Sequence, residues 1–117
     1  MVKIENGSGV ISITSDVFTN LAGDAATRCF GVKGMAGRAK GDGIAVLLRR
    51  ESMSKGVVVH FPEEGGVNIE LHIVVDHGVN ITTLARSIIS EVGYKVTEAT
   101  GVKVNRVDVF VDSMLLD

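Results

Sequence analysis

The chain has 117 residues, of which 45% are hydrophobic and 22% charged, and its formal net charge is -2 at pH 7. This length fits one domain with one core, and the composition excludes a disordered chain, a collagen-like repeat and a disulfide scaffold, since Cys29 is the single cysteine. No apolar run approaches the ~20 residues that cross a bilayer, and the N-terminus lacks the layout of a signal peptide. A soluble cytoplasmic protein is therefore expected.

The first predicted elements are a short strand and a helix. Val10–Ile13 is typical of a short strand. Thr14 or Ser15 can then cap a helix over Asp16–Cys29, in which apolar residues recur at intervals of three and four. Cys29 continues the apolar stripe of this helix, so we expect it to be a small core residue.

A glycine-rich stretch follows, with five glycines between residues 31 and 43. Within it, Val32–Ala36 fits either a short strand or a loop. Asp42 can cap a short helix that carries the apolar residues from Ile44 to Leu48 and ends near Ser54. The spacing of the glycines matches neither a dinucleotide-binding loop nor a P-loop, so nucleotide binding of either type is not expected.

The second half of the chain predicts an antiparallel hairpin. Apolar and polar residues alternate over Val67–Val75, which is typical of a strand with one buried face, and Gly56–Phe61 has the same pattern. Pro62–Gly66 between them is rich in turn-forming residues. Pairing through this turn places His60 close to Asn68.

A helix and a final strand complete the prediction. Asn80 can cap a helix that starts at Ile81, and Gly101 stops it. The last strand begins at Val102, and its alternation breaks near Asn105, which indicates a bulge there. The order β-α-(β)-α-β-β-α-β predicts one α+β domain over residues 1–117, a two-layer sandwich with the helices on one face of a mixed sheet.

No arrangement of residues in the sequence predicts an enzyme. Nucleophilic catalysis needs a nucleophile beside an oriented base, and no serine lies in a Gly-x-Ser-x-Gly turn. The paired carboxylates Glu63 and Glu64 fall at the tip of the predicted hairpin, which is too exposed for an active site. We therefore expect no catalytic residues and no cofactor.

The three histidines do not predict a metal site. His60 and His72 lie on the polar faces of different predicted strands, and we expect both to be solvated. His77 follows Asp76 in a loop, where the pair could bind a metal only with help from distant residues. Because zinc needs three or four convergent ligands, no metal centre is expected.

Charge is unevenly distributed along the chain. Residues 28–55 hold seven basic side chains and two acidic ones, while the rest of the chain is acidic. This segment fits a surface that attracts phosphate groups or acidic proteins, and it equally fits an ordinary solvated face. The short basic segment over residues 44–52 would bind anionic lipid weakly at best.

One motif supports an alternative function in nucleic-acid binding. Gly31-Val32-Lys33-Gly34 has the Gly-x-x-Gly form with a basic interior residue, and it lies between the first and second predicted helices. KH domains clamp the backbone of single-stranded nucleic acid with such a loop. The basic 28–55 segment agrees with this alternative, whereas Asp42 lies eight residues past Gly34, which makes the loop longer than the tight helix connection of a KH domain.

The order of several phrases resembles the alkaline shock protein family, also called the envelope stress response family, of mostly Gram-positive bacteria. The resemblance covers about residues 8 to 112, and it departs from the family at Thr82, where a proline is frequent, and around Arg28, where an acidic residue is frequent. Its five phrases are Gly9-Val10-Ile11-Ser12-Ile13, Gly31-Val32-Lys33-Gly34-Met35, Ser54-Lys55-Gly56-Val57-Val58-Val59, the run from Gly66 to Ile81, and Thr100-Gly101-Val102-Lys103-Val104.

The resemblance implies a small cytoplasmic scaffold or adaptor without enzymatic activity, linked to cell-envelope stress and homeostasis. It also implies self-association and a protein partner that in some members is membrane-anchored, which would place the protein near the membrane. The family has no agreed catalytic or ligand-binding residues to carry over. Two places remain as candidate interaction surfaces, a basic one and a polar turn after a rigid strand: Lys33, Arg38, Lys40, Arg49 and Arg50 form the first, and Asp76, His77 and Asn80 the second.

Overall fold

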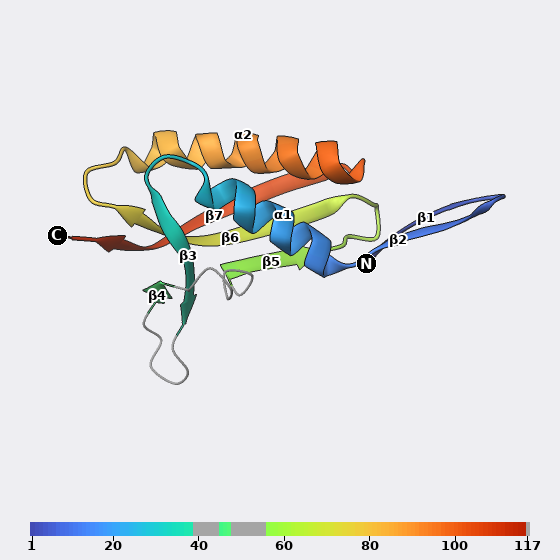
Figure 1. Ribbon diagram of the computed structural model, residues 1–117, viewed down its shortest axis with the longest axis horizontal. Helices are drawn as coiled ribbons and strands as arrows, with labels where there is room; N and C mark the ends of the chain where they lie inside the picture. Colours follow the sequence, from blue (N-terminus) through green and yellow to red (C-terminus); the bar gives the residue numbers. More distant parts are fainter. Residues whose placement is uncertain (39–44, 48–55, 117) are drawn as a thin grey trace.

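Two helices cover one face of a five-stranded sheet, and a separate two-stranded hairpin projects from the end of this body (Figure 1). The computed structural model describes residues 1–38, 45–47 and 56–116. The predicted α+β class with two layers is confirmed. The elements are β1 (Val2–Asn6), β2 (Gly9–Ile13), α1 (Ser15–Thr27), β3 (Val32–Arg38), β4 (Ala45–Leu47), β5 (Val57–His60), β6 (Val67–Asp76), α2 (Ile81–Thr100) and β7 (Val104–Leu115).

Strand β6 is the centre of the sheet because it has partners on both edges. Along one edge it pairs in parallel with β7 over its whole length. Along the other edge it pairs antiparallel with β5 and, further on, with β3. The sheet is therefore mixed, as predicted. The alternation of β6 is explained by its position, since Ile69, Leu71 and Ile73 face the helices and are at most 1% exposed.

The β5–β6 hairpin and helix α2 form as the sequence predicts. His60 lies opposite Asn68 in the β5–β6 register. The Asn80 side chain accepts a hydrogen bond of 3.1 Å from the backbone N–H of Thr83, which satisfies one of the free donors at the start of α2. At the other end Gly101 adopts a left-handed conformation, with φ of 71°, which terminates the helix.

The final strand also has its predicted irregularity. The register between β6 and β7 shifts where Val67 pairs with Val104 and Asn68 with Arg106, so Asn105 is the extra residue of a bulge. The amide of Asn105 donates a 2.9 Å hydrogen bond to the Gly65 carbonyl, which ties the bulge to the β5–β6 turn.

The core lies between the sheet and the two helices. Phe18 of α1 is fully buried and meets Phe61 edge-on, with 5.7 Å between the ring centroids. On α2 the buried residues Leu84, Ile88, Val92 and Val96 recur at every fourth position, which is the spacing of one helix face. Neither helix in the described parts of the chain is long and apolar enough to span a membrane.

Two predictions in the first half need correction, and one open alternative is decided. The short helix predicted from Ile44 to Leu48 is wrong over Ala45–Leu47, because these residues form β4 and pair with the end of β3. The rest of that predicted helix lies outside the described residues. Helix α1 ends at Thr27, so Cys29 lies in the turn that follows and only partly contacts the core. Val32–Ala36, which fitted a strand or a loop, belongs to β3.

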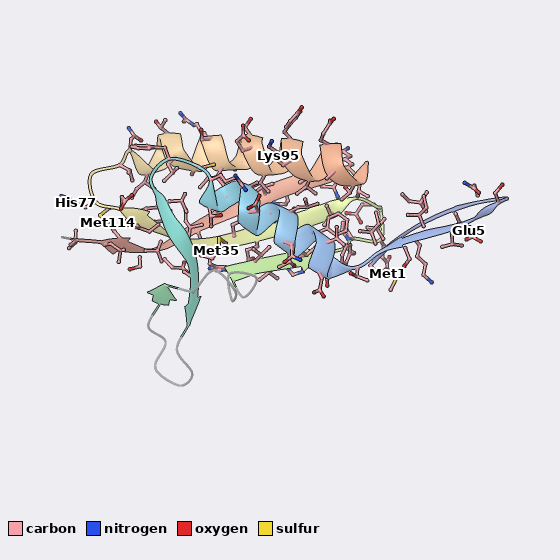
Figure 2. All side chains as sticks on the ribbon, viewed as in Figure 1. Met1, Glu5, Met35, His77, Lys95 and Met114 are labelled. Atoms are coloured by element: carbon pink, nitrogen blue, oxygen red, sulfur yellow. The ribbon has the colours of Figure 1, made fainter. Side chains whose placement is uncertain are left out.

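The first strand of the structure is absent from the sequence prediction. Strand β1 pairs with β2 in a hairpin whose turn is held by Asn6, since its side-chain oxygen accepts hydrogen bonds from the N–H groups of Ser8 and Gly9. At the base of the hairpin, Val2 and Ile13 contact the core. In Figure 2, Met1 lies near the base of this hairpin and Glu5 lies towards its tip, where the hairpin projects away from the rest of the protein.

Candidate functional site

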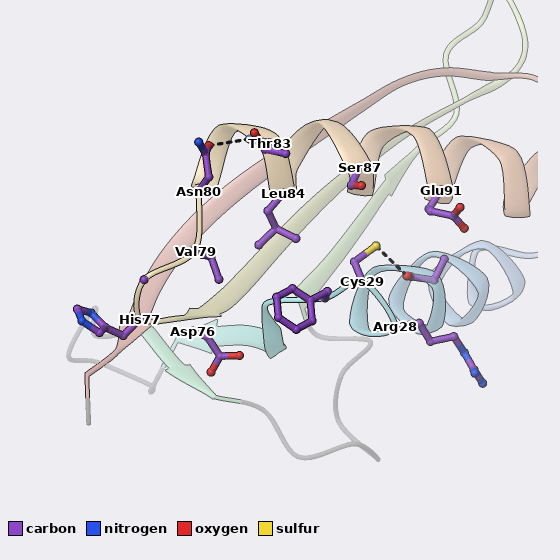
Figure 3. A pocket seen from close by; sticks show the side chains of 13 residues that line it. Arg28, Cys29, Asp76, His77, Val79, Asn80, Thr83, Leu84, Ser87 and Glu91 are labelled. Carbon is purple, nitrogen blue, oxygen red and sulfur yellow. Dashed lines mark hydrogen bonds between the residues drawn. The ribbon is translucent and has the colours of Figure 1, made fainter.

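An open cavity of about 950 Å³ lies where the turn after α1, the β6–α2 loop and the first half of α2 meet. We call it the end groove; its lining includes Arg28, Cys29 and Phe30 from the turn, Asp76, His77, Val79 and Asn80 from the loop, and Leu84, Ser87 and Glu91 from α2. Figure 3 shows Asp76 and His77 at one end of this groove and Arg28 and Glu91 at the other.

Gly31 brings the two loops of the end groove together. Its carbonyl accepts a 2.9 Å hydrogen bond from the N–H of Asp76, which joins the start of β3 to the end of β6. Gly31 has a φ of 96°, and a Cβ at this position would lie 2.9 Å from Cγ1 of Val79. A side chain here would therefore be strained and would push the β6–α2 loop away.

The end groove brings together half of the surface residues that the sequence singled out. Asp76, His77 and Asn80 all line it. Lys33 lies at its edge, with its Nζ 3.5 Å from Oδ1 of Asp76, and both side chains are about half exposed. The remaining predicted residues lie outside what the structure describes: the side chain of Arg38, and all of Lys40, Arg49 and Arg50.

Sequence reasoning missed the most exposed apolar residue of the groove. Phe30 is 94% exposed, in the turn between α1 and β3. Single exposed apolar residues are ordinary on protein surfaces, but Phe30 lies at a cavity that Val79 and Leu84 also line. Apolar side chains grouped at a cavity are typical of places where another molecule docks. The signal in the sequence is its position, because Phe30 follows the apolar stripe of α1 and precedes Gly31, so it falls outside both elements.

Cys29 is a thiol in the lining of the groove, and its surroundings keep it protonated. The Cys29 thiol donates a weak 3.5 Å hydrogen bond to the Ala25 carbonyl, and burial, together with the negative charge of Glu91, raises the pKa of Cys29. A thiol held in its protonated form is a poor nucleophile. Among the described residues no group of three metal-ligating side chains converges. Arg28 is already paired with Asp24, at 2.9 Å.

The Gly-x-x-Gly motif does not form a loop between two helices. Gly34 lies within β3, where it pairs with Val74 of β6, and Met35 pairs with Ile73. Backbone N–H groups engaged in a sheet are not free to clamp phosphates, and both Gly34 and Met35 are buried. The geometry that the KH-like alternative requires is therefore absent at residues 31–34.

The prediction that His72 is solvated is wrong. Its Nδ1 lies 2.8 Å from Oδ2 of Asp112 and its Nε2 lies 2.9 Å from Oε2 of Glu70. The ring also stacks on Phe110, with 4.9 Å between centroids and 11° between planes. This cluster lies on the sheet face opposite the helices. Partial burial lowers the pKa of His72, but the hydrogen bonds and charges of Glu70 and Asp112 outweigh it, so the pKa is raised.

The raised pKa of His72 predicts how stability depends on pH. Because the folded state holds this proton more tightly than the unfolded chain, the stabilisation is complete below the ordinary value of 6.5 and is lost as pH rises through the raised pKa. We expect the free energy of unfolding to fall over this range by up to about 1 kcal/mol, the scale of partly exposed ion pairs. Urea titrations at a series of pH values would measure it.

The matched control for this prediction is His72→Gln, which should flatten that part of the pH profile. In the double variant Glu70→Gln and Asp112→Asn, the two carboxylate charges beside the ring are removed, so the NMR titration midpoint of His72 should fall relative to wild type. An unchanged midpoint in the double variant would contradict the role of the two carboxylates.

Comparison with known proteins agrees with the resemblance seen in the sequence. The family model of alkaline shock protein 23, described as having a cell envelope-related function, matches residues 3–116. The chain is 32% identical over 115 residues to the uncharacterised protein YloU of Bacillus subtilis strain 168, covering 97% of this chain and 94% of the relative. It is 33% identical over 114 residues to the uncharacterised protein Spy1614 of Streptococcus pyogenes serotype M6, covering 97% and 93%.

No solved structure matches the chain. The family match extends from β1 to the end of β7 and therefore includes both the end groove and the His72 cluster. The chain belongs to the alkaline shock protein 23 family, whose function is related to the cell envelope.

Proposed function

We propose that this protein is a non-enzymatic adaptor that binds a protein partner in the end groove and acts as a homo-oligomer at the cell envelope. In this proposal the chain is cytoplasmic and reaches the membrane through a membrane-anchored partner. The single observation that carries it is Phe30, which is 94% exposed beside a cavity of about 950 Å³. Aromatic side chains at the centre of an interface commonly supply much of the binding energy.

The lining of the end groove suggests what the partner presents. Leu84 and Val79 form apolar surface next to Phe30, so an apolar or aromatic side chain of the partner fits there. Glu91 adds one negative charge to the lining that no described residue pairs with, because Asp76 pairs with Lys33 and Arg28 pairs with Asp24. We therefore propose a partner segment that carries an apolar anchor flanked by a basic residue.

The test compares wild-type protein with Phe30→Ser in a quantitative capture from bacterial lysate, with and without nuclease. The captured protein should be the same in both nuclease conditions, it should fractionate with the membrane, and its amount should fall at least about tenfold in the variant, the scale of losing one hot-spot side chain. Because Phe30 makes few contacts, Phe30→Ser should keep the circular dichroism and urea midpoint of wild type.

The matched control is Val10→Ser, which removes a side chain that is 57% exposed on β2, away from the groove. It should capture the partner as wild type does. Equal capture by Phe30→Ser and wild type would reject the groove as the docking site. Nuclease-sensitive RNA in place of protein would reject the adaptor function itself.

A further inference from the structure

Strand β7 has a long edge that no described residue pairs with. Its residues 104–115 pair with β6 on one side, and no other strand among residues 1–38, 45–47 and 56–116 pairs with β7. Natural proteins commonly protect such an edge with proline, a short strand, charges, bulges or a cover. This edge is twelve residues long and contains no proline, but it has bulges at Asn105 and Asp112 and charged side chains, so it can pair only with a strand whose charges match.

We infer that β7 pairs with β7 of a second copy of the chain, antiparallel and across a two-fold axis, so that two sheets join into one. This inference rests on the oligomeric part of the proposed function and is independent of the end groove. A two-fold axis perpendicular to the sheet maps each face onto itself, so every residue of β7 must oppose a residue from the same face.

The charges on the open face of β7 select the register. Arg106, Asp108, Phe110 and Asp112 lie on the face opposite the helices, and Arg106 contacts Asp108 at 2.8 Å. Asp112 is the extra residue of a second bulge, because the register with β6 shifts between Val111 and Ser113. When Val109 lies opposite Val109 of the second copy, Arg106 of each copy faces Asp112 of the other, so the ion pair forms twice. Asp108 then faces Phe110, so no like charges oppose each other.

Neighbouring registers are less favourable. When Phe110 lies opposite Phe110 of the second copy, Asp108 faces Asp112 of the second copy, and this repulsive pair occurs twice. When Asp108 lies opposite Asp108 of the second copy, the two carboxylates repel each other, which is also destabilising. Centring on Val107 again pairs opposite charges, but it aligns only residues 104–110 instead of 104–114. Among these registers, the one centred on Val109 is the one that combines a long ladder with two ion pairs.

Each ion pair has the groups it needs. Arg106 is 66% exposed, so its guanidinium can reach across the edge. Asp112 uses Oδ2 for its contact with His72, which leaves Oδ1 for the arginine. On the helix-facing side the same register sets Val107 opposite Val111 of the second copy, and β-branched pairs of this kind stabilise a ladder.

Helix α2 provides a second, independent observation at the same edge. The α2 residues Ser87, Glu91 and those that follow at the same spacing face α1, while Ile89 lies on the other side of the helix, which is the side towards β7. Ile89 is 43% exposed, although it is a large apolar residue within a packed layer. Pairing of two β7 strands would bring the α2 helices of the two copies together and cover it.

The test is sedimentation equilibrium of the full chain over about 1–200 µM, combined with a charge exchange. The wild type should reach twice its 12.4 kDa chain mass. Arg106→Asp should raise the dissociation constant at least about tenfold, because it replaces two attractive pairs with two repulsive ones. Asp112→Arg should do the same, and the double variant should restore the affinity to within about threefold of wild type.

A covalent variant checks the register directly. In a Cys29→Ser background, Val109→Cys should form a disulfide-linked dimer on oxidation, because the two Cβ atoms of opposed residues lie close together. Val58→Cys on β5 is the control, since Val58 is exposed on a different strand and should give little linked dimer. Lys95→Asp on α2 is the control for charge reversal and should leave the dissociation constant unchanged.

Each outcome separates this inference from the proposed function. A chain that stays at 12.4 kDa at every concentration, a double variant that fails to restore affinity, or equal cross-linking at positions 58 and 109 would overturn the β7 pairing. Loss of partner capture in Phe30→Ser with an intact dimer would leave the pairing standing. Capture that survives Phe30→Ser while the dimer forms would reject the groove alone.

Discussion

Replacing Phe18 by alanine should lower the free energy of unfolding by about 3–5 kcal/mol, the cost of removing a fully buried phenylalanine. Phe18 is 0% exposed, and its ring meets Phe61 edge-on between α1 and the start of the β5–β6 turn. The substitution would leave a cavity that the rigid sheet cannot close. Urea unfolding followed by circular dichroism would measure the loss.

Val17 is a matched control for this experiment because it precedes Phe18 on the same helix. Its side chain is 41% exposed. Val17→Ala should therefore change the free energy of unfolding by about 0.5 kcal/mol or less. Both variants should be compared at one protein concentration, because self-association shifts apparent stability. Equal losses in the two variants would contradict the described packing of α1.

Replacing Gly56 by alanine should destabilise the protein by about 2–3 kcal/mol, towards the upper end of the usual cost of overpacking. Gly56 lies where β3 and β5 share one edge of β6. A Cβ there would lie 2.9 Å from the Ala36 carbonyl oxygen and 3.0 Å from the His72 carbonyl oxygen. These are backbone atoms of the sheet, so they cannot move aside cheaply. The midpoint of urea unfolding would report the effect.

Replacing Gly93 by alanine should stabilise the protein, in contrast to the same substitution at Gly56. It lies within α2, and no heavy atom falls within 4 Å of the position that a Cβ would occupy. Gly93→Ala should raise the free energy of unfolding by about 0.5–1 kcal/mol, because alanine favours a helix over glycine by that amount. A Gly56→Ala variant as stable as Gly93→Ala would show that the junction of β3 and β5 is looser than described.

Much of the second half of the fold could be predicted because each element carries its own signal. The alternation of β6, the asparagine cap of α2 and the glycine that ends it are local features, and the structure has all three. The prediction for the first half was wrong or incomplete where the local sequence signals were weak. Gly7-Ser8, preceded by Asn6, is a turn signal after the alternating residues of β1, so β1 could have been predicted from it. Ala45–Leu47 shows no local sign of the β3 partner that makes it a strand.

The candidate site was predictable only in part, because it is built from segments far apart in the chain. The exposed turn at Asp76, His77 and Asn80 follows from its place after a strand. The meeting of that turn with Phe30 depends on the antiparallel pairing of β3 with β6, which no local pattern reveals. The surroundings of His72 were missed for a related reason, since Asp112 reaches it only through the parallel pairing of β6 with β7.

The β1–β2 hairpin gives the molecule two levels of stability. Its strands pair chiefly with each other, and only its base contacts the core. An isolated two-stranded hairpin is marginally stable in water, so its backbone hydrogen bonds can open without unfolding the sheet. Strand β6, by contrast, has partners on both edges and opens only with the whole domain. The amides of one small protein should therefore exchange with solvent in two separate classes, one local and one global.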